Sequence, residues 1–561
     1  MVKTVAIGIQ NFEKLIQDGY FYIDKTDFIR EWWESGDDVT LITRPRRFGK
    51  TLNMSMLETF FSVKYAERGD LFEGLSIWKD EKYHTLQGTY PVIFLSFANV
   101  KEQDYGTTRK KICQILTKLY AEHAYLLDSG LLYETDISYF KRVSENMDDS
   151  DASLALYQLS DFLYRYYGKK AIILLDEYDT PMQEAYVDGY WDELVGFTRN
   201  LFNSTFKTNP YLERAVMTGI TRVSKESIFS DLNNLKVVTT TSDAYATAFG
   251  FTEQEVFDAL DQYGYDERKA DVKEWYDGFI FGEHKDIYNP WSILNFLDTG
   301  ELATYWANTS SNSLVGKLVR ESDEEIKGMF ESLLKREHIY CPIDEQIVFN
   351  QLDENPDAIW SLLLASGYLK VLSVGEKEAG KDQIYEVALT NTEVLDMFYS
   401  MVRGWFKRSG RNYNGFIKAL LADNLKEMNI YMNQVALQTF SYFDAGTRPS
   451  ETGQPENFYH GFVLGLLVEL SGAYTVTSNR ESGYGRYDVV IEPLERHKNA
   501  YIFEFKVHDA EEEKTLADTV ASAHQQIKEK QYEALLIAKG ITEENIRKYG
   551  FAFEGKKVLI G

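Results

Sequence analysis

The chain has 561 residues, and its 60 Lys and Arg residues against 87 Asp and Glu residues give a formal net charge of −27. This balance argues against a uniformly basic nucleic-acid coat, and a content of 44% hydrophobic and 14% aromatic residues excludes a disordered chain. The two cysteines, Cys113 and Cys341, stand far apart and outside any CxxC pair, so neither a disulfide framework nor a zinc knuckle is available. We expect a folded protein of about three or four domains in a reducing cytoplasm.

The sequence gives no sign of a membrane partner. Its amino-terminal residues lack the long apolar core and small-residue cleavage site of a signal peptide. The most apolar later window, residues 461–470, is too short to span a bilayer and contains Glu469. We therefore expect a cytoplasmic protein.

The charge is unevenly distributed along the chain. Residues 1–400 hold 40 basic and 66 acidic residues, a net of −26, whereas residues 401–561 hold 20 and 21, a net of −1. Such asymmetry suggests different partners for the two ends. For the first part, the simplest interpretation is that an acidic surface maintains solubility.

Five short apolar runs, separated by helical stretches, occupy the first 240 residues. The runs are continuous rather than alternating, which is typical of strands buried on both faces of a parallel sheet. They cover residues 39–43, 91–97, 171–175, 214–220 and, more weakly, 236–240. We predict an α/β fold here, with a parallel sheet flanked by helices.

The next part of the chain has a different pattern. Residues 246–400 are mostly helical in pattern, with one hairpin at 368–374 and 383–389, which favours a connector or lid. Residues 444–455 are rich in turn formers and are typical of a loop before the last domain.

A phosphate-binding signal follows the first apolar run, in Thr43-Arg-Pro-Arg-Arg-Phe-Gly-Lys-Thr51. In a strand–loop–helix of this kind, backbone N–H groups hold phosphate, Lys50 reaches the outer phosphates and the Thr51 hydroxyl joins Mg²⁺. The P-loop pattern has a glycine where this chain has Arg44, but Arg44, Arg46 and Arg47 add three cations that could themselves hold phosphate. For this motif alone, the alternative is an ordinary strand-to-helix turn with solvated arginines.

The third apolar run ends in adjacent acids, Asp176 and Glu177. This ending places Asp176 at the carboxyl edge of the sheet, where open α/β sheets bind ligands. There Asp176 could hold Mg²⁺ and Glu177 could orient or deprotonate an attacking water, although acids at strand ends also cap helices. At the end of the fourth run, Thr218 and the nearby Arg222 could sense a γ-phosphate, and a structural role for Thr218 is an equal alternative.

At this point the chain resembles a known family, the AAA-ATPase-like proteins that carry a carboxy-terminal PD-(D/E)XK nuclease domain. The resemblance covers nearly the whole chain and implies nucleotide binding more firmly than hydrolysis. A P-loop without its first glycine is usual in that family. The segments that carry the resemblance are Ile7–Phe12, Tyr22–Thr26, Arg44–Thr51, Leu175–Pro181, Thr218–Arg222, Leu232–Leu235, Trp275–Gly278, Tyr288–Ser292 and Tyr305–Asn308. The implied nucleotide ligands are Arg44, Arg46, Arg47, Phe48, Gly49, Lys50, Thr51, Asp176, Thr218 and Arg222.

The resemblance also implies that Tyr22 to Thr26 lie near the nucleotide base. The alternative for Tyr22, which we favour, is simple core packing.

The last domain contains an acidic constellation on two strands. In Tyr501-Ile-Phe-Glu-Phe-Lys-Val507, Glu504 and Lys506 share one face of a strand whose other face is apolar. Asp488 lies on the preceding strand, at a distance that a hairpin can close. Asp488, Glu504 and the Phe505 carbonyl would hold Mg²⁺, while Lys506 positions the water or stabilises charge on the phosphate. A plain cross-strand ion pair is the alternative for this spacing alone.

The flanking segments resemble the PD-(D/E)XK fold as well. The resemblance implies auxiliary roles for Glu456 and His460 on a helix before the first strand, and for Gln526 and Tyr532 after the E-x-K strand. Glu469 is a rival to Glu456 as the helix carboxylate. Tyr487 stands where the pattern has its proline, a position that is no ligand.

Together, these features predict three domains. They are an AAA-ATPase-like nucleotide-binding domain at 1–245, a mainly helical lid or connector at 246–400, and a PD-(D/E)XK nuclease-like domain at 401–561. The expected function is an ATP-binding protein coupled to a Mg²⁺-dependent (or Mn²⁺-dependent) nuclease of DNA or RNA. The alternatives are a non-hydrolytic nucleotide-dependent switch or scaffold, and an acidic interaction module whose charged pairs are structural. The sequence leaves the oligomeric state open.

Overall fold

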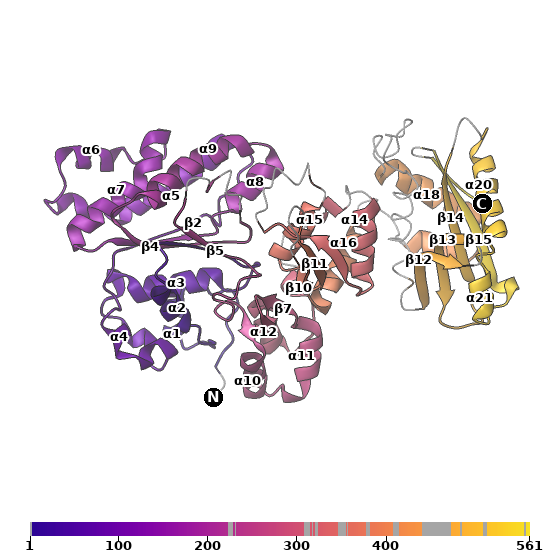
Figure 1. The fold of residues 1–561 in the computed structure, drawn as a ribbon, viewed down its shortest axis with the longest axis horizontal. Coiled ribbons are helices and arrows are strands. Elements are labelled where there is room, and N and C mark those ends of the chain that lie inside the picture. Colours follow the sequence, from indigo (N-terminus) through magenta and orange to yellow (C-terminus); the bar gives the residue numbers. More distant parts are fainter. Residues whose placement is uncertain are drawn as a thin grey trace. The chain divides into compact units, whose positions relative to one another are not determined.

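The computed structural model describes most of the chain in two compact units (Figure 1). The first contains residues 1–318 and 331–397, and the second contains residues 319–330 and 398–561. The described residues are 3–222, 228–229, 232–307, 315–316, 318–319, 324–345, 355, 357–376, 382–407, 414–439, 470, 473–482, 485–508, 513–554 and 557–561.

The first unit is built on a parallel sheet of five strands in the order β2-β3-β4-β1-β5. The strands are β1 (Val39–Thr43), β2 (Val92–Ser96), β3 (Ala171–Asp176), β4 (Leu212–Gly219) and β5 (Leu235–Val238). Every residue of β1 and β3 is buried, as a strand covered on both faces requires. The predicted α/β fold is confirmed, with strands at the five apolar runs.

Helices cover both faces of this sheet. Figure 1 shows α5, α7 and α9 along one face and α1 to α3 along the other. The helices up to β4 are α1 (Phe12–Gln17), α2 (Asp27–Ser35), α3 (Lys50–Phe61), α4 (Glu81–His84), α5 (Tyr105–Glu122), α6 (Glu134–Arg142), α7 (Asp149–Tyr167), α8 (Thr180–Asp188) and α9 (Trp191–Phe202).

The rest of the first unit mixes helices with two small antiparallel sheets, whereas the sequence pattern predicted one hairpin. That hairpin is present as β10 (Leu369–Val374) and β11 (Ile384–Leu389), and β9 (Ile339–Pro342) adds to it. The other sheet has the order β6-β8-β7. Its elements and the helices of this region are β6 (Phe251–Thr252), β7 (Phe279–Phe281), β8 (His284–Tyr288), α10 (Glu253–Tyr263), α11 (Lys269–Tyr276), α12 (Pro290–Thr299) and α15 (Ala358–Ala365).

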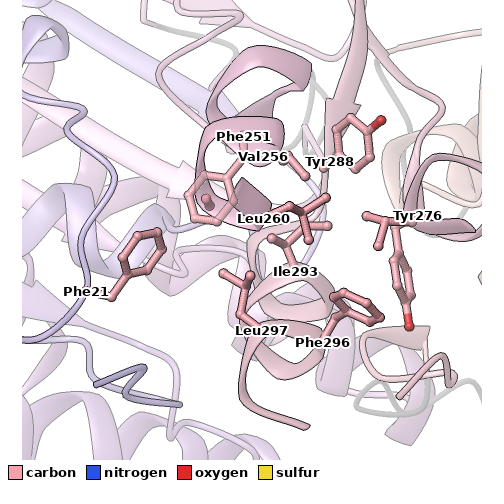
Figure 2. Close-up of a cluster of buried hydrophobic side chains, with 11 residues drawn as sticks. Phe21, Phe251, Val256, Leu260, Tyr276, Tyr288, Ile293, Phe296 and Leu297 are labelled. Carbon is pink, nitrogen blue, oxygen red and sulfur yellow. The ribbon is translucent and has the colours of Figure 1, made fainter. Parts of the chain in front are cut away.

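A cluster of buried apolar side chains holds α10, α11 and α12 together (Figure 2). Thr252 and Glu255 form a capping box at the start of α10, and Asn289 caps α12 ahead of Pro290. These caps fix where each helix begins, so the apolar faces meet in register. The labelled members of the cluster are Phe21, Phe251, Val256, Leu260, Tyr276, Tyr288, Ile293, Phe296 and Leu297.

The second unit contains a mixed sheet in the order β12-β13-β14-β15-β16. Only β14 and β15 are parallel, and α20 connects them, because parallel neighbours need a crossover. Asn429 and Asn433 of α18 hold the edge strand β16 through paired amide bonds to its backbone, at 2.6–3.0 Å. The elements are β12 (Tyr474–Ser482), β13 (Gly485–Pro493), β14 (Ala500–Val507), β15 (Ile546–Glu554), β16 (Lys557–Ile560), α17 (Asn414–Leu421), α18 (Leu425–Thr439), α20 (Leu516–Lys530) and α21 (Ala534–Ala538).

Two further helices are α14 (Glu324–Leu334) and α16 (Thr392–Lys407). Within the described ranges, no helix combines the length and the apolar content needed to cross a bilayer.

A buried carboxylate connects separate segments in the later part of the first unit. Glu393, in the first turn of α16, is fully buried and accepts hydrogen bonds from the Ser292 hydroxyl at 2.7 Å and the Trp306 backbone N–H at 2.6 Å. Burial raises the pKa of Glu393 from 4.5 to about 7, against the lowering effect of these bonds. The carboxyl group therefore joins α12 to the chain near residue 306 from the interior.

The Glu393 pKa predicts how the stability of the first unit depends on pH. Because the folded pKa is raised, folding favours the protonated form, so the free energy of unfolding should fall as pH rises from about 4.5 to about 7. Glu393→Gln should remove this component, roughly 3 kcal/mol at most. Denaturant titrations at several pH values measure it, with the exposed Glu337→Gln as control. Equal pH slopes in wild type and Glu393→Gln would contradict the prediction.

Candidate functional site

The loop between β1 and α3 lacks the first glycine of the P-loop pattern and contains two left-handed residues. Arg47 and Gly49 have left-handed backbones, with φ of 66° and 76°, and α3 begins at Lys50 directly after Gly49. Arg44 does not have positive φ, and its N–H bonds the Gly219 carbonyl at 3.1 Å. The backbone therefore requires a flexible residue at position 49 but not at position 44.

Arg44 is used inside the protein. Its side chain is fully buried and donates to the carbonyls of Thr43, Thr239 and Ala244 at 3.0, 2.6 and 3.2 Å. Its guanidinium also lies 4.6 Å from the centre of the Phe281 ring, a cation–π contact, and burial lowers its pKa. These contacts do not support the prediction that Arg44 binds phosphate.

Lys50 is nearly buried, and its ammonium lies within its own loop. The Nζ atom donates to the carbonyls of Arg44 and Pro45 at 3.1 and 3.0 Å, and lies 3.5 Å from the Glu177 carboxylate. The residues predicted to hold the outer phosphates and to orient water are thus neighbours. Glu177 itself has a left-handed backbone, with φ of 53°.

Three hydroxyl groups surround the buried carboxylate of Asp176. Thr51 donates to it at 2.9 Å, Thr218 at 2.7 Å and Ser96 at 3.3 Å. Burial and the nearby Glu177 raise the pKa of Asp176, while the threonine bonds oppose that rise. The structure brings Lys50, Thr51, Asp176, Glu177 and Thr218 together at the carboxyl edge of the sheet, where the sequence predicted them.

The turn after β4, which begins at Ile220, is held by Asp179 of the neighbouring loop after β3. The fully buried Asp179 carboxylate accepts from the N–H groups of Ile220 and Thr221 at 2.9 and 2.8 Å, and from the Thr221 hydroxyl at 2.9 Å. Tyr178 donates its hydroxyl to the Thr221 carbonyl at 2.8 Å. The position of Thr218 is therefore fixed by the acidic segment that also supplies Asp176.

The other predicted ligands in and near the loop take separate places. Arg46 donates to the Gln183 amide oxygen at 3.3 Å, and the exposed Arg47 stacks on Trp291 at 4.2 Å from the ring. The buried Phe48 ring packs between Phe279 and Phe281. Arg222 lines a small cavity with Thr43, Thr239 and Glu345.

The segment Tyr22 to Thr26 is a packing element. Tyr22 donates its hydroxyl to the Met56 sulfur at 3.6 Å, which agrees with the core-packing interpretation. The nearly buried Lys25 ammonium binds the Glu255 carboxylate at 2.6 Å and the Thr247 carbonyl at 2.9 Å. Lys25 thus joins the amino-terminal segment to the start of α10.

In the second unit, β14 carries the E-x-K residues. Glu504 is 2% exposed and Lys506 is half-buried. In the pairing of β13 with β14, Val489 lies opposite Phe503. Continued by one residue, this register places the backbone of Asp488 opposite Glu504, so the two positions share a face. Only the backbone of Asp488 is described.

The helix α20 supplies a partner for this strand. The Gln526 side-chain amide donates to the Glu504 carboxylate and lies 3.2 Å from the Tyr532 hydroxyl. Gln526 and Tyr532, both taken from the resemblance, therefore adjoin the E-x-K strand. Glu456, His460 and Glu469 lie outside the described residues.

One acidic cluster elsewhere resembles a metal site but contains its own cation. Glu253, Asp277 and Asp286 lie close together in the first unit. The Lys273 ammonium pairs with Glu253, and lies 3.7 Å from Asp277 and 3.4 Å from Asp286. An ion-pair network explains this cluster.

Sequence reasoning missed three residues of the nucleotide-site network: Ser96, Asp179 and Gln183. Ser96 carried a usable signal, because it ends a buried strand beside Asp176 in the sheet. Asp179 lies in the segment Leu175–Pro181 that carries the resemblance, whereas Gln183 carried no signal. The contacts of both depend on how the loop after β3 and α8 fold back on the turn after β4.

Comparison with known proteins agrees with this architecture. Residues 6–229 match the family described as predicted AAA-ATPase, and residues 454–561 match the PD-(D/E)XK nuclease superfamily. The chain therefore combines an AAA-ATPase-like domain with a PD-(D/E)XK nuclease-like domain. It is also 26% identical over 572 residues to a protein of Azotobacter chroococcum mcd 1 named "Uncharacterized protein in vnfD 5′region", covering 96% of this chain and 94% of that protein.

The AAA-ATPase-like domain yields a prediction at Gly219. An added Cβ there would lie 2.7 Å from both the Asp179 carboxylate and the Tyr178 ring, which are buried and cannot withdraw. We expect Gly219→Ala to lower the free energy of unfolding by roughly 1–3 kcal/mol. The control is Gly196→Ala in α9, where a Cβ meets nothing within 4 Å and should be neutral or stabilising by up to about 1 kcal/mol. Denaturant unfolding distinguishes them, and equal midpoints would show that the turn tolerates the methyl group.

Proposed function

We propose that this chain is a nucleotide-controlled nuclease, in which ATP binding to the AAA-ATPase-like domain governs Mg²⁺-dependent hydrolysis of DNA or RNA by the PD-(D/E)XK domain. The observation that carries the proposal is the convergence of Lys50, Thr51 and Asp176 on one point of the sheet edge. A lysine, a hydroxyl and a carboxylate beside a helix amino terminus are the groups that a Mg²⁺–triphosphate requires.

In the nucleotide site, the residues have separable roles. The N–H groups at the start of α3 and the Lys50 ammonium would bind phosphate oxygens, and Arg46 and Arg47 would add positive charge at the loop. The Thr51 hydroxyl and Asp176 carboxylate, 2.9 Å apart, form an oxygen pair that suits Mg²⁺. Mg²⁺ would supply charge neutralisation between the outer phosphates. Glu177 would orient water, and Thr218 and Arg222 would face the terminal phosphate.

In the nuclease site, the donor set also fits a hard divalent cation. The Glu504 carboxylate, the Phe505 carbonyl and the carboxylate of Asp488 are oxygen ligands of the kind that Mg²⁺ and Mn²⁺ prefer. The cation would polarise the scissile phosphate and favour ionisation of water. Lys506 would stabilise the charge that grows on the phosphate, and Gln526 holds the Glu504 carboxylate in place.

One observation favours a second candidate, a non-hydrolytic switch. The Lys50 ammonium is bound by two carbonyls of its own loop and adjoins Glu177, so both groups are engaged with each other. Nucleotide binding would have to break these contacts of Lys50, which could change the conformation of the loop without hydrolysis of ATP. Release of inorganic phosphate from ATP separates the two candidates, because a switch binds ATP and releases none.

The nucleotide proposal is tested at Lys50. Lys50→Ala should weaken ATP binding at least 10-fold, since a charge-assisted bond to phosphate contributes roughly 1.5–3 kcal/mol. Calorimetric titration of the full chain measures the affinity. The control, Lys82→Ala, removes an exposed ammonium elsewhere in the same unit and should leave the affinity unchanged. ATP binding that survives in Lys50→Ala at full strength would remove the phosphate-loop argument.

The nuclease proposal is tested at Asp488 and Lys506. The full chain should cleave nucleic acid in the presence of Mg²⁺ or Mn²⁺, and Asp488→Ala or Lys506→Ala should reduce the rate by at least 100-fold, because each removes transition-state stabilisation. Single- and double-stranded DNA and RNA, with and without ATP, are the substrates. Lys557→Ala, at an exposed position of the same sheet, should retain the rate. Cleavage that persists in both site variants would assign the activity to another site.

A further inference from the structure

Gln183 of α8 connects the phosphate loop to the turn after β4. Its amide oxygen accepts from the Arg46 guanidinium at 3.3 Å, and its amide nitrogen donates to the Asp179 carboxylate at 3.3 Å. This orientation of the amide is set by its partners, since a guanidinium can only donate and a carboxylate can only accept. Gln183 therefore spans a cation and an anion that do not contact each other in the described contacts.

Asp179 links Gln183 to the turn after β4. Its carboxylate is fully buried and accepts from the backbone of Ile220 and Thr221. Its donors all meet one oxygen, Oδ2, while Oδ1 has no hydrogen-bond partner among the described residues. Among these donors Gln183 is the one that lies outside the turn, and it binds a group whose burial is costly. Loss of that donor should shift the carboxylate and, with it, the turn.

The turn follows directly on the residues proposed to hold Mg²⁺. Thr218, next to last in β4, bonds the Asp176 carboxylate at 2.7 Å, and Asp176 bonds Thr51 at 2.9 Å. The Arg46 guanidinium is therefore joined through Gln183 and Asp179 to Ile220 and Thr221, just beyond Thr218 in the chain.

We propose that Gln183 is a positioning residue that couples Arg46 to the turn after β4. A phosphate bound at the terminal position would therefore affect Arg46 and the turn together. This inference rests on the proposed nucleotide binding and deepens it. Gln183 acts through Arg46 and Asp179 and does not itself contact the nucleotide. A third phosphate would contact the turn as well as the loop with Arg46, whereas a diphosphate would contact the loop alone.

The test compares binding of a non-hydrolysable ATP analogue with binding of ADP in the full chain. Gln183→Met keeps the length of the side chain but removes both hydrogen bonds. It should lower the preference for the triphosphate over ADP by roughly 3- to 10-fold, the range expected for one or two hydrogen bonds. The exposed Asp188→Asn at the end of the same helix should leave that preference unchanged.

Two further variants separate coupling from simple destabilisation. Gln183→Glu keeps an acceptor for Arg46 but faces the Asp179 carboxylate with a like charge, so it should lower affinity for the triphosphate more than Gln183→Met does. In a double-mutant cycle, Arg46→Met should add little to the loss already caused by Gln183→Met. Thermal unfolding confirms that each variant is folded.

The possible outcomes have separate meanings. An unchanged preference in Gln183→Met, an equal loss for both nucleotides, or full additivity with Arg46→Met would each overturn the coupling. None of these results affects the nucleotide proposal, which stands or falls with Lys50→Ala. If Lys50→Ala binds ATP as the wild type does, nucleotide binding at this loop is wrong, whatever Gln183→Met shows.

Discussion

The requirement to satisfy the buried carboxylate of Asp176 organises the carboxyl edge of the parallel sheet. An ionised carboxylate away from water is costly unless hydrogen-bonded, and its donors come from three other elements: Ser96 at the end of β2, Thr218 near the end of β4, and Thr51 in the first turn of α3. The strand register supplies the first of these directly, since Ser96 pairs with Asp176 across the sheet. A shift of one strand by one residue would turn the side chain that donates to Asp176 to the other face of the sheet. The site is therefore a consequence of sheet register rather than of a loop alone.

The backbone conformation of the loop explains why it can lack the first glycine of the P-loop pattern. A glycine is needed where the backbone is left-handed or where another chain approaches closely, and here that need falls on position 49. Arg44 has an ordinary backbone, and its side chain is used to bond three carbonyls behind the loop. Arg47 does have a left-handed backbone, which costs a non-glycine residue roughly 1–2 kcal/mol, and its stacking on Trp291 offsets part of this cost. Contacts with residues outside the loop thus support both arginines.

Much of this architecture could be predicted from the sequence, because its signals are local. Continuous apolar runs marked β1 to β5, and the acids after the third run marked the ligand edge. The small sheet of β6, β7 and β8 could not be predicted, since these strands are short and depend on packing against α10 and α12. The burial of Arg44 could not be predicted either. A charged residue in a phosphate loop suggests a phosphate ligand, and only the tertiary fold shows the carbonyls to which Arg44 donates. The E-x-K pattern was local too, whereas its contact with Gln526 required the crossover helix to lie on the strand.

The short range of electrostatic interactions in salt solution limits the effect of the net charge on ligand binding. At physiological ionic strength the Debye length is about 8 Å, so a net charge of −26 over residues 1–400 would act weakly on a phosphate bound at Lys50, Arg46 and Arg47. Nucleotide binding there would depend on these contacts and on the helix amino terminus, not on the sum of charges. A long nucleic acid differs, because its capture usually relies on many released counterions along an extended basic surface. Residues 401–561 are close to neutral, so attraction of a nucleic acid there would have to come from contacts at the proposed site, from a cation held by it, or from a basic surface that a partner provides.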